Sequence, residues 1–181
     1  MSVADVQARF YEAVARGKVW GVANQAGITT QAGLSATTPA LTLFNPKGSG
    51  VNGVIWFAGA NNSVAFAAAA LIWLGANTDI AAADVTGTAT TAHRNLLLGN
   101  GSQPAIRPLL AATLPAAPIA IASIGVGLTG AITTLPVVPT VGRWFDGSLV
   151  LAPGSAISFQ TSAASGATGF FGEFVWEEVS L

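Results

Sequence analysis

Two stretches near the C-terminus decide the fold: Leu149-Val-Leu-Ala-Pro-Gly-Ser-Ala-Ile-Ser-Phe-Gln-Thr-Ser162 and Gly169-Phe-Phe-Gly-Glu-Phe-Val-Trp-Glu-Glu-Val179. In both stretches side-chain character alternates with a period of two, which is typical of β-strands that bury one face. Pro153-Gly154 and the small residues at 163–168 are typical of turns. We therefore predict three closing strands: Leu149–Leu151, Ala156–Thr161 and Gly169–Val179.

The last of these strands has a heavy aromatic face. Phe170, Phe174 and Trp176 fall on one side with Gly172 and Glu178. The other side carries Phe171, Glu173, Val175, Glu177 and Val179. We predict that Phe170, Phe174 and Trp176 form core packing that continues into a subunit contact.

The rest of the chain repeats this pattern in shorter form, as about eight to ten strands separated by Gly and Pro. Leu41–Phe44 and Val51–Ala58 flank the turn Asn45–Gly50, which predicts a β-hairpin. Arg143–Gly147 is interpreted as a turn, and four prolines exclude a long helix in Pro104–Pro118. Further strands are predicted at Lys18–Ala23, Ser63–Leu74 and Ile119–Ile124, an extended segment at Leu135–Val141, and a loop at Asn77–Ala92. The pattern predicts a mainly β protein: one antiparallel β-sandwich domain, jelly-roll-like, over residues 18–181.

The N-terminal segment differs from this pattern. Val3, Val6, Phe10 and Val14 recur at helical spacing, with polar residues between them. We predict an amphipathic helix over Val3–Ala15, so that residues 1–17 form a docking arm whose four apolar residues contact a partner. A helix folded back onto its own sandwich explains the spacing equally well.

Composition limits the classes of function. Charged residues make up only 8% of the 181 residues, against about 25% in ordinary soluble proteins, and the net charge is -1. A surface so poor in charge predicts burial against other subunits, although a monomer coated with Thr, Ser, Asn and Gly is the alternative. The seven basic residues are scattered, which argues against nucleic acid as a partner. No stretch offers about 20 unbroken apolar residues, so we predict no membrane span.

Catalytic patterns are weak. His93 is the only histidine, and although Asp84 and many serines could complete a triad, Gly-x-Ser-x-Gly does not occur. Gly125–Gly130 matches GxGxxG, but a proline-bounded β-branched run follows it, so we interpret it as a flexible turn. Glu173 and Glu177 lie about 13 Å apart on an extended strand, too far for a glycosidase pair, and with Glu178 they are interpreted as a polar rim. We predict no enzyme activity, no cofactor and no metal site.

The five tryptophans are interpreted mainly as core or interface anchors, and less readily as a carbohydrate platform. Four of them fall within predicted strands among apolar neighbours. The five are Trp20, Trp56, Trp73, Trp144 and Trp176.

Two stretches resemble small virion structural proteins of tailed bacteriophages. Leu43-Phe-Asn-Pro-Lys-Gly-Ser-Gly-Val-Asn52 is similar to the L-[FY]-N-P-x-G-S-G hairpin of those proteins, and Leu151–Gly154 with Phe171–Val179 is similar to their C-terminal end. The resemblance implies a non-enzymatic capsid decoration or cement protein of the outer capsid surface, made in the host cytoplasm. It also implies a homotrimer whose partner is the major capsid protein.

A second hypothesis belongs to a different class. The chain could be a host-surface or glycan-binding module of a phage tail or fibre. Loop tips such as Asn77–Ala92, together with exposed Trp, would then form the binding surface.

Overall fold

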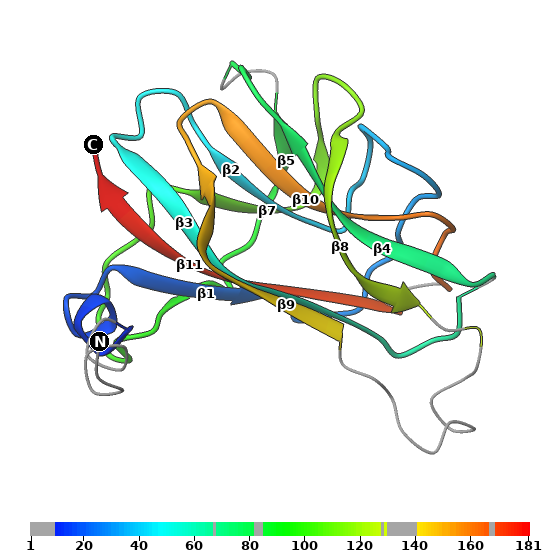
Figure 1. Ribbon diagram of the computed structural model, residues 1–181, viewed down its shortest axis with the longest axis horizontal. Helices are drawn as coiled ribbons and strands as arrows, with labels where there is room; N and C mark the ends of the chain where they lie inside the picture. The colour runs from blue at the N-terminus through cyan, green and yellow to red at the C-terminus, as the bar shows by residue number, and fades with distance from the viewer. Residues whose placement is uncertain (1–9, 67, 82–84, 128, 130–140, 167–168) are drawn as a thin grey trace.

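The structure is a computed structural model that describes residues 10–66, 68–81, 85–127, 129, 141–166 and 169–181. Two antiparallel sheets pack face to face, and a short helix of residues 10–15 precedes the first strand (Figure 1). The predicted antiparallel β-sandwich with an N-terminal helix is therefore confirmed.

Each sheet mixes strands from distant parts of the chain. The five-stranded sheet has the spatial order β6 (Arg94–Asn95), β1 (Val19–Ala23), β11 (Phe170–Ser180), β3 (Val51–Asn62) and β9 (Val141–Leu151). The six-stranded sheet has the order β5 (Thr86–Ala89), β7 (Arg107–Thr113), β2 (Leu41–Asn45), β10 (Ser155–Thr161), β4 (Ala70–Asn77) and β8 (Ile119–Gly127). Strand β11 lies at the centre of the first sheet, paired with β1 and β3.

Alternation in β10 and β11 builds the middle of the core. Phe170, Phe174 and Trp176 of β11 are all 0% exposed, and the Phe159 ring of β10 faces them from the other sheet. Its centroid lies 5.8 Å from that of Phe170 and 4.7 Å from that of Phe174. Gly172 makes this possible, since a Cβ there would lie 2.9 Å from the Phe159 ring. The spacing Phe-x-Gly-x-Phe thus leaves a gap between two rings that a third ring fills.

The predicted hairpin at Asn45–Gly50 is wrong. β2 belongs to the six-stranded sheet and β3 to the five-stranded sheet, so the turn connects the two layers. The buried Asn45 amide, at the end of β2, donates to the carbonyl oxygens of Val51 in β3 and Leu151 in β9, both at 2.8 Å, and so ties the end of β2 to the five-stranded sheet. Gly48 and Gly50 adopt φ of 82° and 75°, a left-handed conformation that glycine reaches without strain.

The predicted turn at Arg143–Gly147 lies inside β9. Asp146 and Gly147 do have left-handed φ, 47° and 84°, as a turn would require. The strand nevertheless continues, because Trp144 pairs with Phe57 and Leu149 pairs with Ile55 of β3 on either side of the irregularity. The turn signal therefore produces a bulge that bends an edge strand.

Other boundaries differ from the sequence predictions. Strand β4 begins at Ala70, so the strand predicted over Ser63–Leu74 is displaced toward the C-terminus. Gly125–Gly127 ends β8, so this part of the predicted glycine turn is extended. Strand β5 lies within the predicted loop and β7 within the proline-rich segment. Of the predicted extended segment Leu135–Val141, only Val141 is described.

Candidate interaction surface

The predicted interface residues of β11 are not on the surface. Phe170, Phe174 and Trp176 are 0% exposed and contact the six-stranded sheet from within the sandwich. In this conformation they have no surface to offer a second subunit, so their role in the described structure is to hold the two sheets together. Alternation correctly predicted their shared face, but it carries no information on what covers that face.

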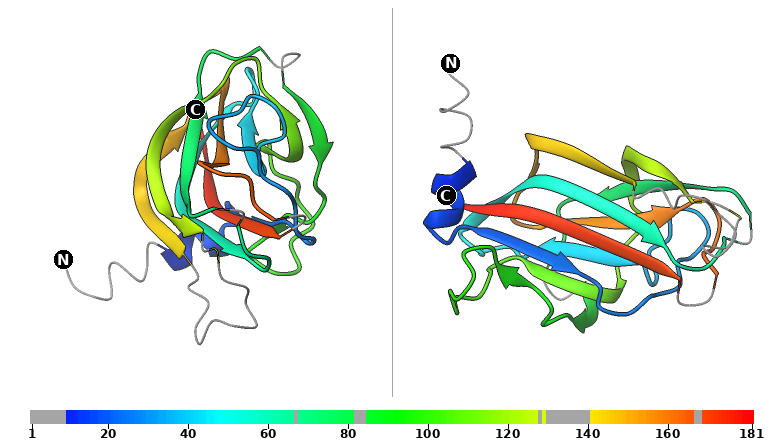
Figure 2. Two further views of the ribbon diagram at one scale, coloured as in Figure 1. Left: turned by 90° about the vertical axis from the view of Figure 1, so that its right-hand side faces the viewer. Right: turned by 90° about the horizontal axis from the view of Figure 1, so that it is seen from below.

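The described part of the N-terminal helix packs on its own sandwich. Phe10 meets Trp56 edge-on, with ring centroids 4.9 Å apart and planes at 83°. Val14 and the buried Ala13 join the same outer cluster on the five-stranded sheet. Figure 2 shows the helix at one end of that sheet. Phe10 and Val14 therefore support the folded-back alternative, whereas Val3 and Val6 lie outside the described residues.

His93 lies beside a cleft of about 340 Å³ that Trp20 and Ser102 also line. Its Nδ1 lies 2.9 Å from the Thr90 carbonyl oxygen, and its Nε2 lies 2.8 Å from the Gln103 side-chain oxygen. Uncharged partners thus occupy both ring nitrogens, as expected for a histidine that positions a loop. No described carboxylate contacts the ring, and Asp84 lies outside the described residues.

The three C-terminal carboxylates have separate roles. Glu178 is 9% exposed, so its interpretation as polar rim is wrong. Its two oxygens accept the backbone N–H groups of Ala105 (3.1 Å) and Ile106 (2.9 Å), and the Trp176 indole N–H donates at 3.5 Å. Glu178 therefore clamps the segment before β7 to the end of β11. The proline-rich composition of Pro104–Pro118 does not indicate that two of its backbone N–H groups bind Glu178.

Glu177 faces the opposite side of the sheet, as alternation predicts. With Glu12, Arg16 and Lys18 it lines a groove of about 380 Å³ beside the helix. The groove carries both signs of charge, which does not favour one class of ligand.

An exposed ion pair ties two loops at one end of the sandwich. Lys47 Nζ lies 2.7 Å from Asp79 Oδ1. This hydrogen bond, reinforced by the positive charge of Lys47, lowers the pKa of the Asp79 carboxyl. Because both side chains are largely in water, the pair orients loops and contributes little to stability.

A lateral cleft opens between the two sheets where β8 and β9 form their edges. Its volume is about 270 Å³, and we use the name for the space lined by residues 55, 76–78, 121, 149–152 and 155–157. Buried Ile55 and Ile157 are among its lining residues, while Ile121 and Val150 are 45% and 49% exposed. Ile119, which pairs with cleft residue Ala76, is 74% exposed. None of the lining residues is charged.

Trp144 is the most exposed of the five tryptophans, all of which are described. It is 63% exposed on the outer face of β9, whereas Trp20, Trp56 and Trp176 are buried. Their strand-like, apolar sequence contexts do not by themselves separate Trp144 from the other tryptophans. The residues that follow Trp144 distinguish it from the others. Phe145 enters the core, so Trp144 beside it faces outward, and the Asp146-Gly147 bulge comes next.

No protein-family model, curated protein or solved structure matches the chain. Function is therefore inferred from the chain's own residues. Among the described residues, no three His, Asp or Glu side chains lie together as a metal site would require. None of the described helical segments has the length and apolar character to cross a membrane.

Proposed function

We propose that the chain is a non-enzymatic structural protein of a bacteriophage virion: an outer-capsid decoration or cement protein that self-associates and stabilises the head. The lateral cleft is the observation that carries this proposal. The sequence resemblance at Leu43–Asn52 and Phe171–Val179 supplies the class of particle, with the major capsid protein as partner and a homotrimer as the assembly.

The cleft supports self-association because exposed apolar residues surround its opening. Ile119, Ile121 and Val150 surround an uncharged opening at strands β8 and β9. Strand β8 contains no charged residue, and an edge strand without charge or proline readily pairs with another chain. Apolar side chains of a second copy would fill the opening and remove this surface from water.

The engaged ring of His93 and the structural role of Glu178 support the non-enzymatic part of the proposal. His93 binds neutral groups, Glu178 binds backbone N–H groups, and Glu177 lies on the opposite face of the sheet from Glu178. The lateral cleft lies at the sheet edges, and no charged side chain lines it.

Sedimentation velocity at micromolar concentrations tests self-association. We expect wild-type protein to form a discrete oligomer and Ile121→Asp to sediment as a monomer, because the new carboxylate would be buried without a partner. Leu98→Asp is the matched control, since Leu98 is 81% exposed and lies outside the cleft. A wild-type monomer, or an oligomer that tolerates Ile121→Asp, would contradict the role of the cleft.

Particle composition tests the virion assignment separately. Mass spectrometry of purified particles of the phage whose genome encodes the chain should detect it at many copies per particle, and an image reconstruction should place it on the outer shell. Its absence from those particles would overturn the assignment even if the protein oligomerises.

A further inference from the structure

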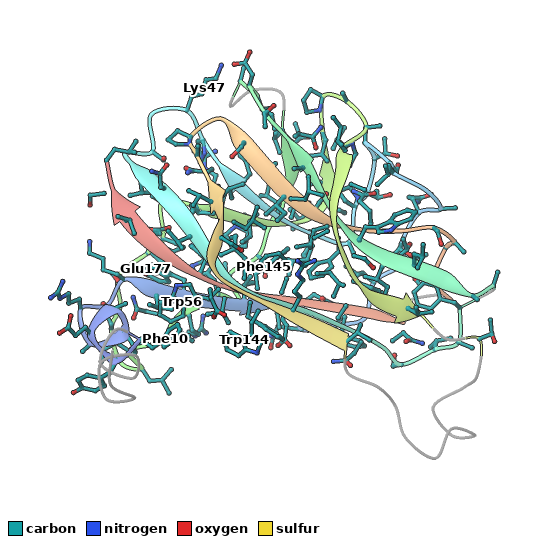
Figure 3. The ribbon with its side chains drawn as sticks, viewed as in Figure 1. Phe10, Lys47, Trp56, Trp144, Phe145 and Glu177 are labelled. Atoms are coloured by element: carbon teal, nitrogen blue, oxygen red, sulfur yellow. The ribbon has the colours of Figure 1, made fainter. Side chains whose placement is uncertain are left out.

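The outer face of the five-stranded sheet carries a second aromatic cluster beyond the helix. The Trp144 and Phe57 ring centroids lie 5.0 Å apart, with planes at 49°. Figure 3 shows Trp144 and Phe145 on opposite sides of β9, with Trp144 turned away from the core. Such an exposed indole leaves a wide apolar ring face in water, which favours a ligand that covers it.

Two glycines set the shape of this face. Gly142 of β9 pairs with Gly59 of β3, and Gly59 pairs with Glu173 of β11, so the three residues form a row across three strands. A Cβ at Gly142 would lie 2.5 Å from the Phe57 ring, and a Cβ at Gly59 would lie 2.7 Å from it. The Phe57 ring therefore lies low over the glycine row, and the two aromatic residues form a shallow platform.

Glu173 stands beside this platform. A Cβ at Gly59 would lie 2.5 Å from Glu173 Oε1, so the carboxylate and the Phe57 ring approach the same point on the sheet. No hydrogen bond or ion pair joins the Glu173 side chain to another described residue. A partly exposed carboxylate in this position offers two acceptor oxygens to donors on a ligand.

We propose that Trp144, Phe57 and Glu173 form a binding site for a neutral carbohydrate. A pyranose ring has an apolar face of C–H groups, which packs on an aromatic surface, and hydroxyl groups at its edge. Two of those hydroxyls can donate to the Glu173 carboxylate while the ring lies on Trp144. One small ligand would therefore cover the aromatic surface and supply hydrogen-bond donors to the carboxylate.

Other occupants fit less well. A dry protein contact over the platform would bury the Glu173 carboxylate without a partner, which is costly. An organic cation would be attracted to the Trp144 ring face and to Glu173, but a quaternary ammonium group has no N–H to donate to the carboxylate. An acidic sugar would be repelled by Glu173. The site goes beyond the proposed structural function and would stand even if the chain proved absent from virions.

Saturation-transfer NMR and titration calorimetry test the site, with glucose, galactose, mannose, N-acetylglucosamine and their short β-linked oligomers as probes. We expect at least one of these sugars to bind the full chain with a dissociation constant of about 1 mM, because a shallow surface makes few contacts. Trp144→Ala should weaken binding about tenfold or more, and Trp144→Phe should restore part of it. Glu173→Gln should weaken it about three- to tenfold, because the amide offers only one acceptor oxygen.

Leu98→Ala is the control, because it also truncates an exposed apolar side chain but lies away from the platform. No binding of any probe at about 10 mM would overturn the proposal, as would sugar binding that survives Trp144→Ala. Choline serves as a competing probe. Choline binding that requires Trp144, with no sugar binding, would reassign the platform to organic cations.

Discussion

The five-stranded sheet carries an aromatic cluster on each face, and the two clusters are built alike. On the inner face the Phe159 ring lies over Gly172 between Phe170 and Phe174. On the outer face the Phe57 ring lies over Gly59 and Gly142 beside Trp144. In both, glycine leaves the space that a ring fills: Phe159 enters it from the opposite sheet, and Phe57 enters it from the same sheet.

What differs is the layer above each cluster. The six-stranded sheet closes the inner face, so its rings are fully buried, whereas Trp144 remains 63% exposed. Similar ring geometry therefore has different consequences. Burial of the whole side chain stabilises the inner cluster, while the outer cluster keeps an open ring face for contact with something else.

The largest expected difference in stability is between removing a ring from the inner face and removing one from the outer face. Trp176→Ala should lower the free energy of unfolding by about 3–5 kcal/mol, because it leaves a cavity between the sheets. Trp144→Ala should change it by less than about 1 kcal/mol, since the indole is mostly in water already. Urea denaturation followed by far-UV circular dichroism measures both.

If Trp176→Ala is too unstable to purify, Phe174→Leu provides a milder cavity at the same layer, with an expected loss of about 1–2 kcal/mol. Equal losses for Trp176→Ala and Trp144→Ala would contradict the division between the two faces. They would indicate that Trp144 is covered in solution.

A smaller effect is expected from the carboxylates that accompany the clusters. Glu178→Ala should lower the free energy of unfolding by about 2 kcal/mol, because the N–H groups of Ala105 and Ile106 lose a buried acceptor. Glu173→Ala should stay within about 0.5 kcal/mol of wild type. Thermal denaturation of wild type and both variants measures these changes. If Glu173→Ala lost as much stability as Glu178→Ala, Glu173 would have a structural role.

Alternation predicted the inner cluster but not the outer one. Burial alternates with period two over the first nine residues of the strand Phe170–Ser180, and the sequence alternates in the same way, so the shared face of Phe170, Phe174 and Trp176 could be predicted. The outer cluster depends on the register between β3 and β9, where the pairing shifts between Ile55 and Phe57, opposite the left-handed Asp146 and Gly147. Local turn chemistry indicated the left-handed backbone there without indicating that the strand continues.

Local sequence patterns likewise do not indicate which of the two sheets a strand joins. Asn45–Gly50 has the composition of a hairpin turn, yet the chain crosses between layers there, and the Asn45 side chain at the end of β2 bonds to β3 and β9 of the other sheet. The lateral cleft also depends on which strands become edges, a property of the whole topology. The buried role of Glu178 depends on a backbone segment more than 70 residues away in sequence.

The smallest expected effect concerns the covered half of the outer face, where the helix rests on Trp56. Phe10→Ala should lower the free energy of unfolding by about 1 kcal/mol, because it removes an edge-on aromatic contact with Trp56 and part of the apolar packing between the helix and the sheet. Tyr11→Ala is the matched control, since Tyr11 is 73% exposed and should be near neutral. Hydrogen exchange at residues 10–15 should accelerate in Phe10→Ala and not in Tyr11→Ala. Unchanged stability and exchange in Phe10→Ala would mean that the ring does not hold the helix on the sheet, and the segment would then be available as the docking arm that its apolar spacing also predicts.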